Sequence, residues 1–134
     1  MQTTTTYMPK IVTQKKIAGY TSRLLEGYNS IMAYDDNILS FRFSAYGTLI
    51  LFNIMNSYYN NKPITSEEIA NSIDYKFGSR NSILNLIKTA EKNKLITRAV
   101  SKSDQRQKYI IPTKALIHSH EKMIGFILNL ESKS

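Results

Sequence analysis

The side chains best suited to chemistry in this sequence are hydroxyls, amides and cations that recur within one short segment. The candidates are Ser79, Arg80, Asn81, Asn85, Lys88, Thr89 and Lys92. Guanidinium and amide groups form paired hydrogen bonds with guanine and adenine, whereas lysines suit phosphates. The set therefore predicts a face that binds duplex DNA. The alternative is an ordinary solvated helix face, but such faces usually carry more acids, and here only Glu91 appears.

The distribution of charge favours the same interpretation. The net charge is +8, and residues 78–114 contribute +7 of it, with nine Lys or Arg and two acids. An excess confined to one segment favours a polyanionic partner over a general solvated basic surface, which is the alternative. The cations that follow the first set are expected to contact DNA as well: Arg98, Lys102, Arg106 and Lys108.

Enzymatic and metal chemistry fit the sequence poorly. The chain has no cysteine, which excludes disulfides, thiolate metal sites and cysteine nucleophiles, and it has no glycine-rich phosphate loop. His118 and His120, with Glu121, suggest a metal site, but positions two apart on a helix diverge by about 200°. We expect no enzyme, no cofactor and no metal, with His120 packed in an interface.

The elements that must position these residues are mostly helical. Apolar residues three or four apart predict a helix over residues 14–34, which Asp35, Asp36 and Asn37 would end. A second helix, from about Ser44 to Asn60, is apolar on nearly every side and should lie at the centre of the domain.

A helix-turn-helix is expected next. Thr65 and Glu68 match a capping box that begins a short helix ending near Ile73, and residues 74–77 supply the turn. Ser79 then opens a second helix, whose buried stripe is expected at Ile83, Leu86, Ile87 and Ala90.

A β-hairpin with a basic tip should follow this pair of helices. Residues 95–100 and 107–111 are β-prone runs on either side of residues 101–106. Pro112 ends the second run, and Thr113 can cap a last helix. The apolar stripe of that helix is too long for the small core to cover.

From residue 64 to about residue 116 the sequence resembles the MarR family of bacterial winged-helix regulators. Ser79-Arg80, Leu95-Ile96-Thr97-Arg98, Asp104-Gln105-Arg106 and Pro112-Thr113 carry the resemblance. Lys94 and Leu116 depart from it, because the family usually has glycine at both positions. Asn93 can take the left-handed conformation that the helix end requires.

The resemblance implies a mainly α fold, a winged helix-turn-helix with a small β-hairpin wing and dimerisation helices at both ends. The recognition helix would enter the major groove, and Arg106 would lie in a flanking minor groove. Asp104 is expected to hold the wing and not to contact DNA. The two outer helices would pair across a two-fold axis through Ile17, Tyr20, Leu24, Tyr28, Leu116, His120, Met123, Ile127 and Leu130.

The expected organisation is a disordered arm over residues 1–13 and a single domain over residues 14–134. That domain divides into a helix and loop (14–43), the winged helix-turn-helix (44–112) and a last helix (113–134). No apolar run approaches the ~20 residues of a membrane span, and we expect a cytoplasmic protein.

The sequence thus predicts a homodimeric, DNA-binding transcriptional regulator. The alternative is a winged-helix module for protein contact or non-specific DNA binding in replication or partition machinery. RNA is less favoured, because the recognition helix and wing lack an exposed aromatic platform. By the resemblance, Tyr20, Tyr28, Tyr34 and Tyr46 could line a pocket for a small aromatic effector, although packing is the simpler role for these rings.

Overall fold

The computed structural model describes residues 13–29 and 35–133 and contains six helices and one hairpin within those ranges. The elements are α1 (Gln14–Asn29), α3 (Asp36–Arg42), α4 (Ala45–Tyr59), α5 (Ser66–Ser72), α6 (Arg80–Lys92), β1 (Ile96–Val100), β2 (Lys108–Pro112) and α7 (Lys114–Lys133). The predicted arm lies outside the described residues except for Thr13. The Thr13 hydroxyl accepts a hydrogen bond from the Lys16 backbone N–H (3.2 Å) at the start of α1.

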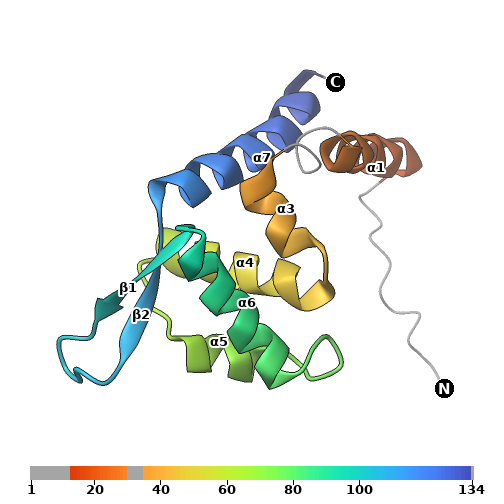
Figure 1. Ribbon diagram of the computed structural model, residues 1–134. Coiled ribbons are helices and arrows are strands. Elements are labelled where there is room, and N and C mark those ends of the chain that lie inside the picture. Colours follow the sequence, from red (N-terminus) through yellow and green to blue (C-terminus); the bar gives the residue numbers. More distant parts are fainter. Residues whose placement is uncertain (1–12, 30–34, 134) are drawn as a thin grey trace.

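Helix α4 forms the centre of the fold, as its apolar sequence predicts. Figure 1 shows α5 and α6 on one side of it and α3 leading to α7 and α1 on the other, with the hairpin projecting from the end of α6. Ile50, Leu51 and Ile54 of α4 have no exposed surface. Burying each such side chain stabilises the fold by about 1.5–3 kcal/mol relative to leaving it in water.

Helix α3 corrects the prediction that residues 35–37 only end a helix. The Asp35 carboxylate accepts a hydrogen bond from the Asn37 backbone N–H (3.1 Å) and so caps a new helix. An aspartate that stops one helix is also a strong N-cap for the next. Ile38 and Phe41 of α3 are fully buried in the core, which fixes this short helix by packing.

Three side-chain caps set the starts of the next helices where the sequence predicts them. Ser44 caps α4, and Thr65 and Glu68 form the reciprocal capping box of α5. Ser79 caps α6 by accepting from the Ser82 backbone N–H (3.1 Å). These caps hold the two helices of the helix-turn-helix at defined starting points.

The end of α6 differs from the sequence expectation. Lys94 takes the left-handed conformation (φ 61°), whereas Asn93 keeps a φ of −85°. Lys94 N–H bonds the Glu91 carbonyl (3.0 Å), and Leu95 N–H bonds the Ala90 carbonyl (2.9 Å). These two bonds make a Schellman motif, with buried Leu95 and Ala90 as its apolar contact. The motif places the left-handed residue at Lys94 despite the steric cost of its side chain.

The wing is an antiparallel hairpin that is joined to both ends of the helix-turn-helix. Its register runs from Ile96 opposite Pro112 to Val100 opposite Lys108. Ile110 N–H bonds the Ile64 carbonyl (2.8 Å) just before α5. The Thr113 hydroxyl does not cap α7 but donates to the Lys94 carbonyl (2.8 Å), at the start of the hairpin. These bonds fix the hairpin relative to α5 and α6.

Helices α1 and α7 pack against each other at one end of the molecule, where Phe126 lies beside Gly27. In the part of the chain that the structure describes, no helix has the length and apolar character needed to cross a membrane.

Candidate nucleic-acid interface

The predicted base-reading face lies on the outside of α6. Arg80, Asn81, Asn85, Lys88, Thr89 and Lys92 are all exposed, whereas Ile83, Ile87 and Ala90 are buried. The helical repeat alone separates these two sets, because positions three or four apart share a face. The structure therefore leaves these amides and cations exposed along the outward side of α6.

Ser79 plays a different part from the other candidates. Its hydroxyl accepts from the Ser82 backbone and also donates to the Ser82 hydroxyl (3.0 Å). Both bonds hold the first turn of α6, so the side chain serves the helix start.

Arg80 is tied to the preceding helix. Its Nη2 forms an ion pair with Glu67 Oε1, and its Nη1 donates to Asn71 Oδ1 (3.1 Å). Both side chains of the ion pair are more than half exposed. Glu67 and Asn71 were not among the predicted site residues, although their spacing of four on a predicted helix places them on one face.

The tip of the wing is ordered by Asp104. Its carboxylate accepts from the backbone N–H (3.0 Å) and from Nε (3.3 Å) of Arg106, and its carbonyl accepts from the Gln107 N–H (3.0 Å). Ser101 is buried and accepts from the Ser103 and Asp104 backbones. The Arg106 side chain is nevertheless 92% exposed, and Lys102 and Lys108 are exposed too. The tip thus presents cations from a defined backbone.

Arg98 was predicted to contact DNA, but its side chain is mostly buried against other elements of the protein. Its Nε donates to Glu91 Oε1 (2.9 Å), its Nη1 donates to Ser66 Oγ (2.9 Å), and only 22% of the side chain is exposed. These bonds join β1 to α6 and α5. Because only about a fifth of its side chain is exposed, against half of that of Arg80, the Arg98 guanidinium is poorly placed to reach a ligand and instead joins the elements of the fold.

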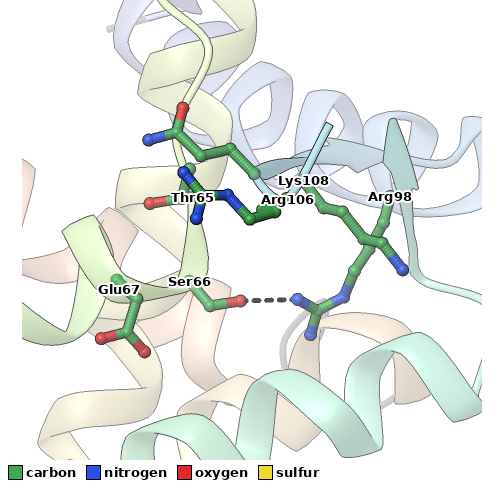
Figure 2. A pocket seen from close by; sticks show the side chains of 7 residues that line it. Thr65, Ser66, Glu67, Arg98, Arg106 and Lys108 are labelled. Carbon is green, nitrogen blue, oxygen red and sulfur yellow. Dashed lines mark hydrogen bonds between the residues drawn. The ribbon is translucent and has the colours of Figure 1, made fainter. Parts of the chain in front are cut away.

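A cleft of about 290 Å³ separates the start of α5 from the wing. It is lined by Thr65, Ser66, Glu67, Arg98, Arg106, Gln107 and Lys108. Figure 2 shows the Ser66–Arg98 hydrogen bond crossing it and the Glu67 carboxylate lying away from the three cations. Two of these cations have acidic partners, since Arg98 pairs with Glu91 and Arg106 with Asp104.

The turn between α5 and α6 carries aromatic rings that the sequence analysis did not single out. Tyr75 is 83% exposed and Phe77 is half exposed. Asp74 fixes the turn, since its carboxylate accepts from the Lys76 N–H (2.9 Å) and its carbonyl from the Phe77 N–H (2.9 Å). The run Tyr75-Lys76-Phe77 beside turn residues was the available signal.

The predicted dimer residues fall into two groups. Ile17, Leu24 and Tyr28 of α1 are about half exposed, and Tyr20 is partly buried. Leu116, Met123 and His120 of α7 are instead buried within the chain itself, which corrects their assignment to a partner surface. The first half of α7 packs against α3, and its His120 lies beside Tyr59 of α4, so its stripe belongs to the core. The side chains of Ile127 and Leu130 lie outside the described residues.

Ile124 and Leu128 form the exposed apolar surface of α7 that the sequence analysis missed. They line an apolar hollow with Tyr59 and His120. The Nδ1 atom of His120 is buried with no hydrogen-bond partner among the described residues. Burial lowers the pKa of His120 below its usual value, against an opposing effect of Glu121, so the imidazole is neutral at pH 7.

The tyrosines proposed for an effector pocket have packing roles. Tyr20 carries the Arg23 guanidinium over its ring (4.3 Å), and Tyr28 carries that of Arg42 (4.4 Å). Tyr46 lies against Gly78, where an added Cβ would come within 2.5 Å of its ring. Tyr34 lies outside the described residues. Among those residues, no three His, Cys, Asp or Glu side chains gather to hold a metal ion.

The chain matches no protein-family model and no curated protein sequence. It is similar to solved structures of transcriptional regulators. The S. aureus MepR–DNA complex has a TM-score of 0.62 at 17% identity, over 90% of this chain and 82% of that one. S. aureus MepR bound to ethidium bromide has a TM-score of 0.62 at 16% identity, over 97% and 82%. Regulator Tm0710 from Thermotoga maritima has a TM-score of 0.53 at 19% identity, over 87% and 78%.

Likeness at these identities shows the fold. A helix-turn-helix, a two-stranded wing and long helices at both ends occur here in the order that the MarR resemblance implies. The chain therefore has a MarR-like winged helix-turn-helix fold.

Proposed function

We propose that this protein is a transcriptional regulator that binds specific sites in double-stranded DNA as a homodimer. The observation that carries the proposal is the outer face of α6, where two asparagines, a threonine and three cations are exposed together beside a basic wing. The fold is shared with MepR, of which a DNA complex has been solved.

The recognition helix would read bases from the major groove. Asn81 and Asn85 lie one helical turn apart and suit the paired donor and acceptor of adenine, and Arg80 suits guanine. Lys88 and Lys92 lie about one and two turns further along the same face and suit phosphates. Side chains that read bases and side chains that bind the backbone thus follow one another along α6.

The wing would reach a flanking minor groove. Arg106 is 92% exposed, and its backbone is held because Asp104 accepts a hydrogen bond from its N–H. A narrow minor groove concentrates negative potential and attracts an inserted arginine. Lys102 and Lys108 would contact the neighbouring phosphates.

The dimer would form through α1 and α7. Only Arg23 and Gly27 of α1 are buried, while its apolar residues Ile17, Leu24 and Tyr28 are half exposed. Ile124 and Leu128 of α7, the helix packed against α1, are exposed apolar residues as well. Exposed apolar side chains on two packed helices favour a partner, and a second copy would also supply the second recognition helix that specificity requires.

The test is selection of bound fragments from random duplex DNA by the purified protein, followed by sequencing. We expect two inverted half-sites whose centres are about 10 base pairs, or a multiple of that, apart. Enrichment of a single unrepeated site would remove the two-fold arrangement. No enrichment above input would favour the alternative, a winged-helix module that meets protein or binds DNA without regard to sequence.

A further inference from the structure

The side chain of Arg80 is not free on the surface of α6, although it is the first residue of that helix. Two residues of α5 hold it: the Glu67 carboxylate pairs with Nη2 and the Asn71 amide oxygen accepts from Nη1 (3.1 Å). Glu67 and Asn71 are four residues apart, so both side chains leave α5 on the face beside the start of α6. Figure 1 shows these two helices side by side.

A guanidinium held at both terminal nitrogens can still bind a base. It has five N–H donors, and the two bonds to α5 use two of them. The three that remain suffice for a bidentate contact with guanine. The two α5 residues therefore fix where the guanidinium points without consuming its capacity to read a base.

The pairing also changes what Arg80 offers to unrelated DNA. An unpaired arginine attracts any phosphate, whereas the neighbouring carboxylate of Glu67 offsets that attraction. A hydrogen bond to a correctly placed guanine depends on geometry, which the pairing preserves. Holding the Arg80 guanidinium in place therefore favours its binding to the correct base over its binding to DNA phosphates of any sequence.

We propose that Glu67 and Asn71 are positioning residues that hold the Arg80 guanidinium for base reading and so set the discrimination at the base pair Arg80 contacts. This inference rests on the proposed function, since it assigns the origin of specificity within the same DNA-binding face.

The first measurement needs no DNA. NMR spectra of the arginine side chains report how fast each guanidinium rotates and how its Nη protons exchange. Slow rotation is expected for Arg80 in the wild-type protein and fast rotation in Glu67→Ala. An Arg80 guanidinium that rotates equally fast in both proteins would overturn the positioning role.

The second measurement is affinity for the selected DNA site and for sites changed at each base pair. Glu67→Ala is expected to lower discrimination by up to about fivefold at the base pair that Arg80→Ala affects, the upper end of the range measured for exposed ion pairs, and Asn71→Ala is expected to lower it in the same direction. Affinity for a scrambled duplex should stay unchanged or rise. Glu67→Gln keeps an acceptor oxygen and should restore part of the discrimination.

A matched control and a double variant isolate the effect. Asp36→Ala removes an acid from the first turn of α3, as Glu67→Ala does from α5, and should leave discrimination unchanged. In the Arg80→Ala background, Glu67→Ala should have no further effect at that base pair. The inference would be overturned if Glu67→Ala lowered affinity equally for every DNA site, or if it lowered discrimination as much in the Arg80→Ala background as in the wild-type protein. Either result would leave sequence-specific binding intact. A wild-type protein with no sequence preference would overturn both proposals.

Discussion

Helices α3 and α4 bury their apolar residues, whereas helix α1 leaves its own exposed. In α4 and α3, the apolar side chains Ile50, Ile54 and Phe41 have no exposed surface. In α1 the buried residues are an arginine and a glycine, Arg23 and Gly27, while the apolar stripe lies exposed. The first region is complete within one chain, and the second holds apolar surface available to a partner.

The same contrast runs through the cations. Arg98 is held by Glu91 and Ser66 between three elements, whereas Arg106 is almost fully exposed at the tip of the wing. Two arginines eight residues apart in one hairpin thus have different roles: Arg98 stabilises the fold, and Arg106 is available to bind a partner. Burial and partners, more than residue type, separate the structural cations from the candidate DNA contacts.

The largest effect on stability is expected in α3 and α4, whose apolar side chains are buried within the chain. Phe41→Ala removes a fully buried ring and should lower the free energy of unfolding by about 3–5 kcal/mol. Chemical denaturation followed by circular dichroism measures the change. A loss below 1 kcal/mol would mean that α3 is not part of the core.

A charge introduced into the exposed apolar stripe of α1 should prevent dimerisation without unfolding the protein. Leu24→Glu places a carboxylate in the proposed seam, where desolvation without a partner is costly. Sedimentation equilibrium should show a monomer with native helix content. Ser22→Glu, at an exposed polar position of the same helix, is the matched control. A Leu24→Glu protein as dimeric as the control would remove α1 from the interface.

Truncating each hairpin arginine should give different losses. Arg98→Ala removes charge-assisted hydrogen bonds that join three elements and should lower stability by about 1–3 kcal/mol. Arg106→Ala should leave thermal stability nearly unchanged and weaken DNA binding. The comparison fails if Arg106→Ala lowers the melting temperature as much as Arg98→Ala does.

The smallest effect is expected at the end of α6. Lys94 has a positive φ, which costs a residue with a Cβ about 1 kcal/mol, so Lys94→Gly should be neutral or stabilise by up to about 1 kcal/mol. Asn93→Gly should not stabilise, because φ at Asn93 is −85°. Thermal unfolding of the two variants measures the difference, and stabilisation by Asn93→Gly alone would contradict the assignment.

Local patterns in the sequence were sufficient for most of the fold. The helix starts near Ser44 and Ser79, the capping box at Thr65 and the hairpin runs were predicted because their signals lie within a few residues of the element they control. Helix α3 was not predicted because an aspartate such as Asp35 can either end one helix or cap the start of the next. Only the burial of Ile38 and Phe41 in the folded protein decides between these two possibilities.

The site could be predicted in its residue types but not in its contacts. The outward face of α6 follows from the helical repeat, which depends on one helix alone. The pairs of Arg80 with Glu67 and of Arg98 with Ser66 join different elements, and no local pattern specifies which side chains meet. The apolar stripe of α7 was misassigned for the same reason: the repeat gives a face, and the tertiary packing decides what covers it.

The most direct test of the central claim is the affinity of the wild-type protein for its selected duplex and for a scrambled one of equal length, measured at several salt concentrations. With about six phosphate contacts, the log–log slope should be about −5, so a fourfold rise in salt should weaken binding by roughly a thousandfold. The selected duplex should also bind about 10³-fold or more tightly than the scrambled one. Equal affinity for the two duplexes with a flat response to salt would contradict the account.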